Sequence, residues 1–138
     1  MELDFNSEKP IYTQLYEQII LALAQGRLKE GDSLPAVRTM AEEIGINLHT
    51  VNKAYGILRD EGYISMDRRR GAVINKMPIK ASEDMMKNIE DSFLLIAAKA
   101  SLAGITKEKF IELCETFYDR CGGKDDEWNN YDQYNNYF

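Results

Sequence analysis

Apolar residues recur every three or four positions along three consecutive segments near the start of the chain, a spacing typical of amphipathic helices. The segments lie at about residues 10–25, 33–44 and 47–61. Pro10 suits the first turn of the first helix, and Gly26 suits its end. The positions expected to face a core are Ile11, Leu15, Ile19, Ala22 and Leu23 in the first segment, Val37, Met40, Ala41 and Ile44 in the second, and Val51, Ala54, Tyr55 and Leu58 in the third.

The second and third segments carry the signals of a helix-turn-helix. Asp32 or Ser33 can cap the second helix, with Pro35 in its first turn, and Gly45 ends that helix. Asn47 can cap the third helix. Because only two or three residues separate the two helices, the spacing predicts a helix-turn-helix.

Two short runs of β-prone residues follow the third helix and bracket a charged turn at residues 67–71. The runs are Tyr63, Ile64 and Met66 before the turn, and Ala72, Val73 and Ile74 after it. This pattern predicts a β-hairpin. A helix-turn-helix followed by a hairpin is the winged-helix arrangement, which we expect over residues 1–77.

The second half of the chain predicts two more helices after a break at Pro78. Ser82 is followed by two acidic residues, which favour a helix start, and Thr106 can cap the last helix. The apolar positions expected to pack in this region are Met86, Ile89, Phe93, Ile96, Ala100, Phe110 and Phe117. We therefore expect a mainly α protein with a small β-hairpin, in which a two-helix dimerisation region at 78–122 follows the winged helix.

Residues 123–138 form a low-complexity tail rich in Asn, Asp and aromatic side chains. Its aromatic residues are Trp128, Tyr131, Tyr134, Tyr137 and Phe138. A disordered tail and a segment that packs against a partner or a second copy both fit this composition.

The net charge of −6 over 138 residues argues by itself against a nucleic-acid partner. The distribution of charge changes this interpretation. Residues 1–80 hold 11 basic and 11 acidic side chains, so residues 81–138 carry all of the excess negative charge. Within residues 47–76, six basic side chains stand against three acidic ones. Such a local excess is typical of a surface that meets a polyanion, although uneven scatter of charge gives the same count.

The composition places the chain among folded soluble proteins and excludes several other classes. Hydrophobic residues make up 44% and charged residues 29%, which is too apolar for a disordered chain. No apolar run is long enough to span a membrane, and the acidic, polar first ten residues do not have the character of a signal peptide. We expect a cytoplasmic protein with no membrane partner.

The residues that usually carry catalysis or bind metals are scarce. His49 is the one histidine, and Cys114 and Cys121 are the two cysteines, seven positions apart on one predicted helix. We expect no metal site and no cofactor. Since no nucleophile–base pair or phosphate-binding loop is present, we also expect no enzyme activity. Buried thiols and a redox or metal switch are both open interpretations of the cysteines.

The third predicted helix has the features of a DNA-recognition helix. Its apolar stripe would pack inward and leave short polar residues near its N-terminus for base edges and phosphates. The candidates on this helix are Asn47, Leu48, His49, Thr50, Asn52 and Lys53, and those on the hairpin are Arg68, Arg69, Arg70 and Gly71. Asparagine pairs with adenine, lysine reaches guanine, and arginine at a wing tip follows phosphates or enters a narrow minor groove. A solvent-exposed polar face, with His49 uninvolved, is the alternative.

These residues also resemble a known family. Pro10-Ile11-Tyr12, the turn from Gly26 to Pro35, Arg38, Thr50-Val51 and Glu61-Gly62-Tyr63-Ile64 follow the order seen in the GntR family of bacterial transcription regulators. The match covers about residues 10–74, and the short C-terminal region resembles the YtrA-type branch. Other branches carry a much larger ligand-binding domain or an aminotransferase-like domain, and 138 residues cannot hold either.

The resemblance implies roles for three positions. Arg38 matches the family arginine that contacts DNA, Thr50 matches the start of the recognition helix, and Arg68 matches the approach of the wing to the minor groove. The chain departs from the family pattern at Leu48 and Asn52, where many relatives have arginine or glutamine, and in the wing, where the usual first glycine is absent. The operator sequence of relatives therefore does not carry over.

The function that these features predict is a sequence-specific DNA-binding transcription regulator. We expect a repressor that binds a palindromic double-stranded operator as a homodimer. One wing and one recognition helix contact only a small area of DNA, and a two-fold dimer doubles that area. The resemblance implies dimerisation through the two C-terminal helices, and an intramolecular hairpin folded onto the winged helix is the alternative. A winged-helix protein–protein interaction module is the second functional hypothesis.

The sequence does not identify a small-molecule effector. Any such ligand is expected at the dimer interface, because the helical pair has little room for a pocket.

Overall fold

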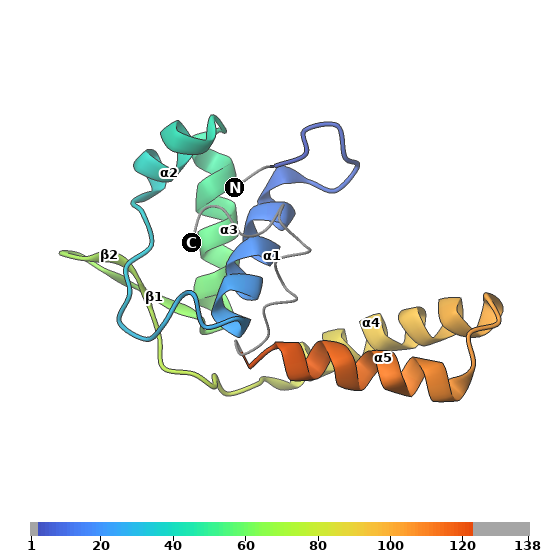
Figure 1. Cartoon of the computed structure of the whole chain (residues 1–138). Helices are drawn as coiled ribbons and strands as arrows, with labels where there is room; N and C mark the ends of the chain where they lie inside the picture. Colours follow the sequence, from blue (N-terminus) through green and yellow to red (C-terminus); the bar gives the residue numbers. More distant parts are fainter. Residues whose placement is uncertain (1–2, 123–138) are drawn as a thin grey trace.

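A computed structural model describes residues 3–122 of the chain (Figure 1). Three helices come first, followed by a two-stranded hairpin and then by two further helices. The elements are α1 (Ile11–Ala24), α2 (Val37–Ile44), α3 (Leu48–Asp60), β1 (Ile64–Asp67), β2 (Gly71–Ile74), α4 (Glu83–Leu102) and α5 (Lys107–Arg120). This order confirms the predicted mainly α fold with a small β-hairpin. The aromatic tail at 123–138 lies outside the described residues.

The core of the winged helix lies between α1, α2, α3 and the hairpin. Its buried members are Leu15, Ile19, Leu34, Met40, Ala41, Val51, Ala54, Tyr55, Leu58, Ile64, Ala72 and Ile74. The predicted stripe of α3 is buried in full, whereas Ile11, Leu23, Val37 and Ile44 are half-buried. Gln18, a polar residue outside the predicted apolar stripe, is also buried on α1.

The helix-turn-helix is formed by α2 and α3, which pack against each other around Gly45. Gly45 adopts a left-handed conformation with φ of 77°, which lets the chain leave α2 without the strain that a Cβ would add. The Asn47 side chain then caps α3 by accepting a hydrogen bond of 2.8 Å from the His49 amide. The Tyr55 hydroxyl donates a hydrogen bond of 2.7 Å to the Pro35 carbonyl and so ties α3 to the segment before α2.

The prediction that Asp32 or Ser33 caps α2 is wrong. Helix α2 begins at Val37 after Ala36, and no side chain caps it. Asp32 and Ser33 instead belong to an extended segment that pairs with β2, where the Ile74 amide donates to the Asp32 carbonyl at 2.8 Å and Ser33 forms a bridge with Val73. A segment that satisfies its backbone by strand pairing is not available to start a helix.

The wing is therefore wider than the sequence indicates. Strands β1 and β2 pair antiparallel, with Ile64 opposite Ile74 and Asp67 opposite Gly71. The segment 31–34 lines the other edge of β2, and the Leu34 amide donates to the Ala72 carbonyl at 2.8 Å. This third extended segment anchors the wing to the turn between α1 and α2.

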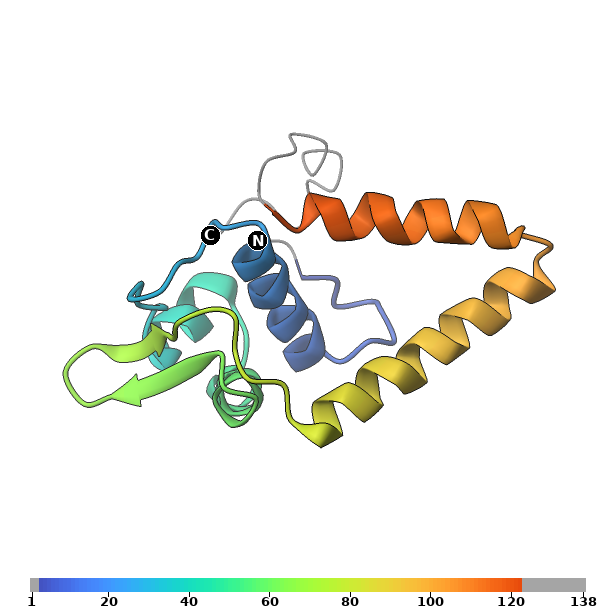
Figure 2. The same cartoon turned by 90° about the horizontal axis from the view of Figure 1, so that it is seen from below.

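Helices α4 and α5 form an arm that leaves the winged helix. Ser82 caps α4 and Thr106 caps α5, as predicted, through hydrogen bonds to the amides of Met85 and Lys109. The two helices meet at the Gly104 turn and diverge from it, so the arm is a V whose mouth faces the winged helix (Figure 2). Within residues 3–122, no helix is long and apolar enough to cross a membrane.

The arm covers few of its own apolar side chains. Phe93 and Phe110 contact each other edge to face, with ring centroids 5.9 Å apart, yet Phe93 remains 49% exposed and Ile96 remains 54% exposed. Ala100 is the one residue of the predicted α4 stripe that is buried. The arm extends away from α1 and α3 and is not folded onto the winged helix as a closed hairpin (Figures 1 and 2).

Candidate DNA-binding surface

The polar face of α3 is presented at the helix N-terminus. Asn47, His49, Asn52 and Lys53 are exposed, and Thr50 is half-buried. The buried stripe of α3 holds the opposite face against α1, as the two helices run side by side in Figure 1. Since the side chain and the carbonyl of Asn47 already accept from the amides of His49, Thr50 and Val51, this end offers an anion mainly its side chains.

Two of the predicted α3 residues are placed differently from the rest. Leu48 is half-buried and packs against the core, so less of its side chain faces solvent than expected. Lys53 is exposed, but its ammonium nitrogen lies over the ring of Tyr12 on α1, 4.0 Å from the ring centroid. The cation–π contact fixes the direction of the lysine side chain relative to α1.

Arg38 is the second residue of α2 and lies on its exposed face. Among the described residues its guanidinium forms no hydrogen bond and no ion pair. Helix α2 packs on α3 and lies beside the N-terminal end of that helix (Figure 1). A guanidinium in this position is suited to a phosphate oxygen.

The wing tip is ordered by Asp67. Its carboxylate accepts hydrogen bonds from the amides of Arg69 at 2.7 Å and Arg70 at 3.0 Å. These two backbone hydrogen bonds, the Arg69 one above all, hold the pKa of the Asp67 carboxyl below its ordinary value. Gly71 closes the turn with φ of 73°, a conformation that favours glycine.

The three wing arginines are not equivalent. The Arg70 guanidinium donates a hydrogen bond to the Gly31 carbonyl and so ties the wing to the preceding turn. Arg68 and Arg69 are exposed, and their side chains form no hydrogen bond or ion pair within the part of the chain that the structure describes. Two cations at the tip are therefore available to a polyanion, and the third has a structural contact.

Sequence reasoning missed Tyr12 and Asp67 as residues of this surface. The Asp67 turn has a local signal, because an aspartate that precedes a tight turn commonly accepts hydrogen bonds from amides two and three positions on. The contact of Tyr12 with Lys53 has no such signal, since the two residues come together only when α1 packs on α3.

Comparison with known proteins identifies the family. Residues 11–74 match the model of the bacterial regulatory proteins of the gntR family. The HTH-type transcriptional repressor YtrA of Bacillus subtilis (strain 168) is 36% identical over 126 residues, which are 90% of this chain and 97% of that protein.

Two solved structures extend the similarity to the arm. YtrA from Sulfolobus acidocaldarius, described as a GntR-family transcription factor, is 33% identical with a TM-score of 0.53, over 86% of this chain and 97% of that one. A structure described as a transcriptional antiterminator from Listeria monocytogenes EGD-e is 25% identical with a TM-score of 0.80, over 91% of this chain and 94% of that one.

These similarities confirm the resemblance seen in the sequence. The matched relatives are regulators of transcription and not enzymes, and their similarity runs through the winged helix and the C-terminal helices. The chain belongs to the GntR family of bacterial regulators and is a transcription regulator with a helix-turn-helix DNA-binding domain, and it is similar over most of its length to YtrA-type members.

Proposed function

We propose that the protein is a repressor that binds a palindromic operator as a homodimer. The observation that carries the proposal is the arrangement of exposed groups without partners around the helix-turn-helix. Among the described residues, Arg38 on α2 and Arg68 and Arg69 on the wing have no side-chain hydrogen bond or ion pair, and the polar end of α3 is exposed to solvent. The arm differs from the winged helix, because its sequence has more acidic than basic residues and many of its apolar side chains are exposed.

In this proposal the N-terminal turns of α3 enter the major groove. Asn52 pairs with the edge of an adenine, and Lys53 leaves the Tyr12 ring to reach a guanine or a phosphate. The Thr50 hydroxyl contacts the DNA backbone, and Asn47 and His49 flank it. Arg68 and Arg69 follow the adjacent minor groove, where negative potential favours arginine. Arg38 holds a phosphate.

The dimer interface in this proposal is the apolar side of the arm. A groove of about 730 Å³ opens between α4 and α5, with Phe93, Ile96, Phe110 and Phe117 in its lining. Met86, Ile89 and Phe117 are exposed by 46%, 52% and 42%, so most of the predicted dimerisation residues, Ala100 excepted, leave apolar surface uncovered. Such a surface is typical of an interface that a second copy covers. Cys114 is half-buried, Cys121 is exposed, and both line this groove.

The proposal that the protein represses transcription rests on the relative from B. subtilis, whose name describes it as a transcriptional repressor. A dimer bound across a promoter excludes other proteins from the same DNA, which requires no additional activity. The sign of regulation is therefore carried over from the relative, whereas the DNA contacts come from this chain's own residues.

A fluorescence-anisotropy titration with DNA from the region upstream of the protein's own operon tests the proposal. We expect saturable binding that falls steeply with salt, because phosphate contacts release counterions. Light scattering of the free protein at the same concentrations should give the mass of two chains. Equal weak binding to unrelated DNA of the same length, or a monomer bound to a single half-site, would contradict it.

The exposed apolar arm also supports a second candidate, a winged-helix module that binds another protein without specific DNA recognition. The salt dependence separates the two functions. A protein partner bound through the arm, together with DNA binding that shows no salt-sensitive component, would favour the interaction module.

A further inference from the structure

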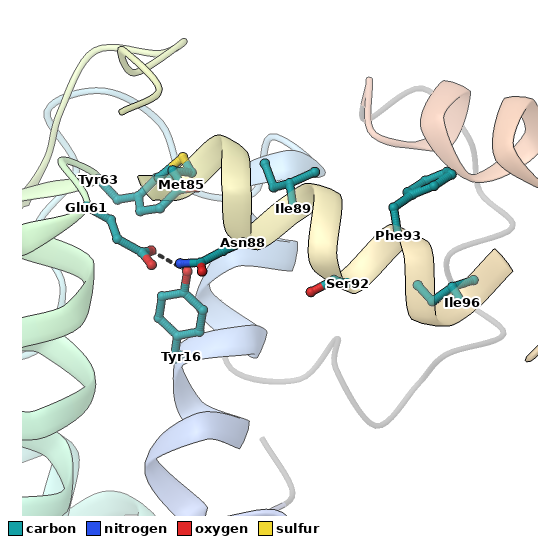
Figure 3. A pocket seen from close by; sticks show the side chains of 9 residues that line it. All are labelled: Tyr16, Glu61, Tyr63, Met85, Asn88, Ile89, Ser92, Phe93 and Ile96. Atoms are coloured by element: carbon teal, nitrogen blue, oxygen red, sulfur yellow. Dashed lines mark hydrogen bonds between the residues drawn. The ribbon is translucent and has the colours of Figure 1, made fainter. Parts of the chain in front are cut away.

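A cavity of about 310 Å³ lies where α4 leaves the winged helix, on the far side of α3 from its polar N-terminus (Figure 3). The winged helix contributes Tyr16 from α1, and Glu61 and Tyr63 from the end of α3 and the start of the hairpin. Helix α4 contributes one face, from Met85 to Ile96. The DNA-binding surface described above uses none of these residues, whereas Ile89, Phe93 and Ile96 also belong to the proposed dimer interface.

The winged-helix wall of the cavity is polar and acidic. The Tyr16 hydroxyl donates a hydrogen bond to the Glu61 carboxylate, drawn as the dashed line in Figure 3. Burial, and then this hydrogen bond, raise the pKa of Tyr16 well above its ordinary value, and burial with the nearby Glu61 charge raises that of Tyr63. Both phenols therefore remain neutral beside the carboxylate.

The negative charge of Glu61 is not balanced locally. The lining contains no lysine, arginine or histidine. Glu61 forms no ion pair among the described residues, and the neighbouring Arg59 pairs instead with Asp60 at 3.2 Å. A half-buried carboxylate without a cation is a site at which a positively charged group gains a charge-assisted hydrogen bond.

The α4 wall is mostly apolar, with two polar groups. Asn88 and Ser92 project from α4 toward Tyr16 and Glu61, and Met85, Ile89 and Phe93 occupy the rest of the face (Figure 3). A ligand that fits both walls needs a hydrogen-bond donor with positive charge at one end and an apolar body at the other. The cavity volume of about 310 Å³ is at the lower end of the range for small-molecule pockets, so the apolar portion of the ligand must be small.

We propose that this cavity binds a small organic cation, a primary amine with an apolar portion. Its ammonium group donates to Glu61 and lies against the Tyr16 and Tyr63 rings, and its apolar portion packs on Ile89 and Phe93 of α4. Asn88 and Ser92 accept the remaining ammonium protons. An aromatic wall beside a carboxylate is a recurring way to hold an ammonium group.

The position of the cavity gives the ligand a regulatory consequence, which rests on the proposed function. Glu61 is the C-cap residue of α3, the helix proposed to read DNA, and α4 begins the arm proposed to join two copies. A ligand that contacts both sides fixes the angle between the winged helix and the arm, and with it the separation of the two recognition helices in a dimer.

Calorimetric titration of the full chain at low ionic strength tests the binding. The probes are 2-phenylethylammonium and n-hexylammonium, with 2-phenylethanol and 3-phenylpropionate as the neutral and anionic analogues of matched size. We expect the ammonium probes to bind at least about 10-fold more tightly than the alcohol, the scale of one charge-assisted hydrogen bond. Equal affinity of alcohol and amine, or no saturable binding of either amine, would overturn the site.

Two variants and one control locate the binding. Glu61→Gln keeps an acceptor for Tyr16 and removes the charge, so the preference for the amine should disappear. Ser92→Phe fills the cavity from α4 with the Tyr16–Glu61 pair intact, so binding of both amine and alcohol should be lost. Glu90→Gln removes an acid from another face of α4 and should bind as wild type does. An amine preference that survives Glu61→Gln would overturn the proposal.

The effect of the amine on operator binding is measured in a separate experiment. Addition of the tightest amine should change operator affinity at least about threefold for the wild type and not for Ser92→Phe. If the amine binds and no DNA binds under any condition, the ligand site stands and the proposed function fails. If operator binding is normal and no amine binds, the proposed function stands and the ligand site fails.

Discussion

The ammonium nitrogen of Lys53 lies 4.0 Å from the centroid of the Tyr12 ring, so a cation of α3 is held by an aromatic residue from the first turn of α1. The two residues are 41 positions apart in the sequence. The contact sets the direction of a side chain that we propose to reach DNA, and it links that direction to the packing of α1 on α3.

We expect Tyr12→Leu to destabilise the fold by about 0.5–1 kcal/mol, the scale of an exposed cation–π contact. Tyr12→Phe keeps the ring face and should be close to wild type. A double-mutant cycle with Lys53→Met, followed by urea unfolding, measures the coupling. A coupling energy of zero between the two positions would show that the contact does not contribute to stability.

Arg38→Ala should weaken operator binding by about 1–3 kcal/mol, the scale of one good contact with DNA. The guanidinium has no partner in the described structure, so stability should be unchanged. Arg59→Ala is the matched control, because Arg59 is also exposed but pairs with Asp60 at the far end of α3. Anisotropy titrations at one salt concentration compare the two variants, and equal affinities would remove Arg38 from the interface.

Protonation of Asp67 should loosen the wing tip only at a pH below the ordinary pKa of an aspartate. Its pKa is held below the ordinary value by the amides of Arg69 and Arg70, so its stabilising contribution is present above the unfolded pKa. That contribution is lost as pH falls through the lower, folded pKa. An NMR titration that follows the Arg69 and Arg70 amides should place their midpoint below that of an unstructured aspartate. In Asp67→Asn the amide oxygen still accepts the hydrogen bonds, and this transition should disappear.

Tyr55→Phe should lower the free energy of unfolding by about 1–2 kcal/mol. The substitution removes the hydroxyl that donates to the Pro35 carbonyl at 2.7 Å and leaves that acceptor without its partner. Because this bond ties α3 to the start of α2, operator affinity should fall as well. Thermal and urea unfolding measure the first effect. Tyr118→Phe, at a position 80% exposed, is the control and should unfold as wild type does.

Phe117→Glu should convert the proposed dimer to a monomer. A charge in the apolar groove of the arm would be desolvated on association, at a cost of about 2 kcal/mol or more. Light scattering should then report half the wild-type mass, with the unfolding of the winged helix unchanged. Lys87→Glu also changes charge on the arm but lies outside the groove and should leave the mass as it is. A dimer that persists in Phe117→Glu would place the interface elsewhere.

The periodic pattern of apolar residues was sufficient to predict the helices, and local residue types predicted the caps of α3, α4 and α5. Asn47, Ser82 and Thr106 cap the helices that the sequence predicted, because capping is a local property of one residue and the amides two or three positions on. The same local reasoning failed at Asp32 and Ser33. Both residues are good caps, but their backbone pairs with β2, more than 38 residues away. A long-range pairing of this kind leaves no trace in local spacing.

The sequence by itself determined the helix-turn-helix, the hairpin, the arm and the family, because each depends on residue types at short, regular spacings. Only the tertiary structure decided which polar groups are free. It gave Arg70 the Gly31 carbonyl as a partner, set Lys53 on Tyr12, and left Arg38, Arg68 and Arg69 without partners among the described residues. It also placed Tyr16 and Glu61 opposite α4 around a cavity. Partners that lie far apart along the chain are chosen by packing, which no single segment encodes.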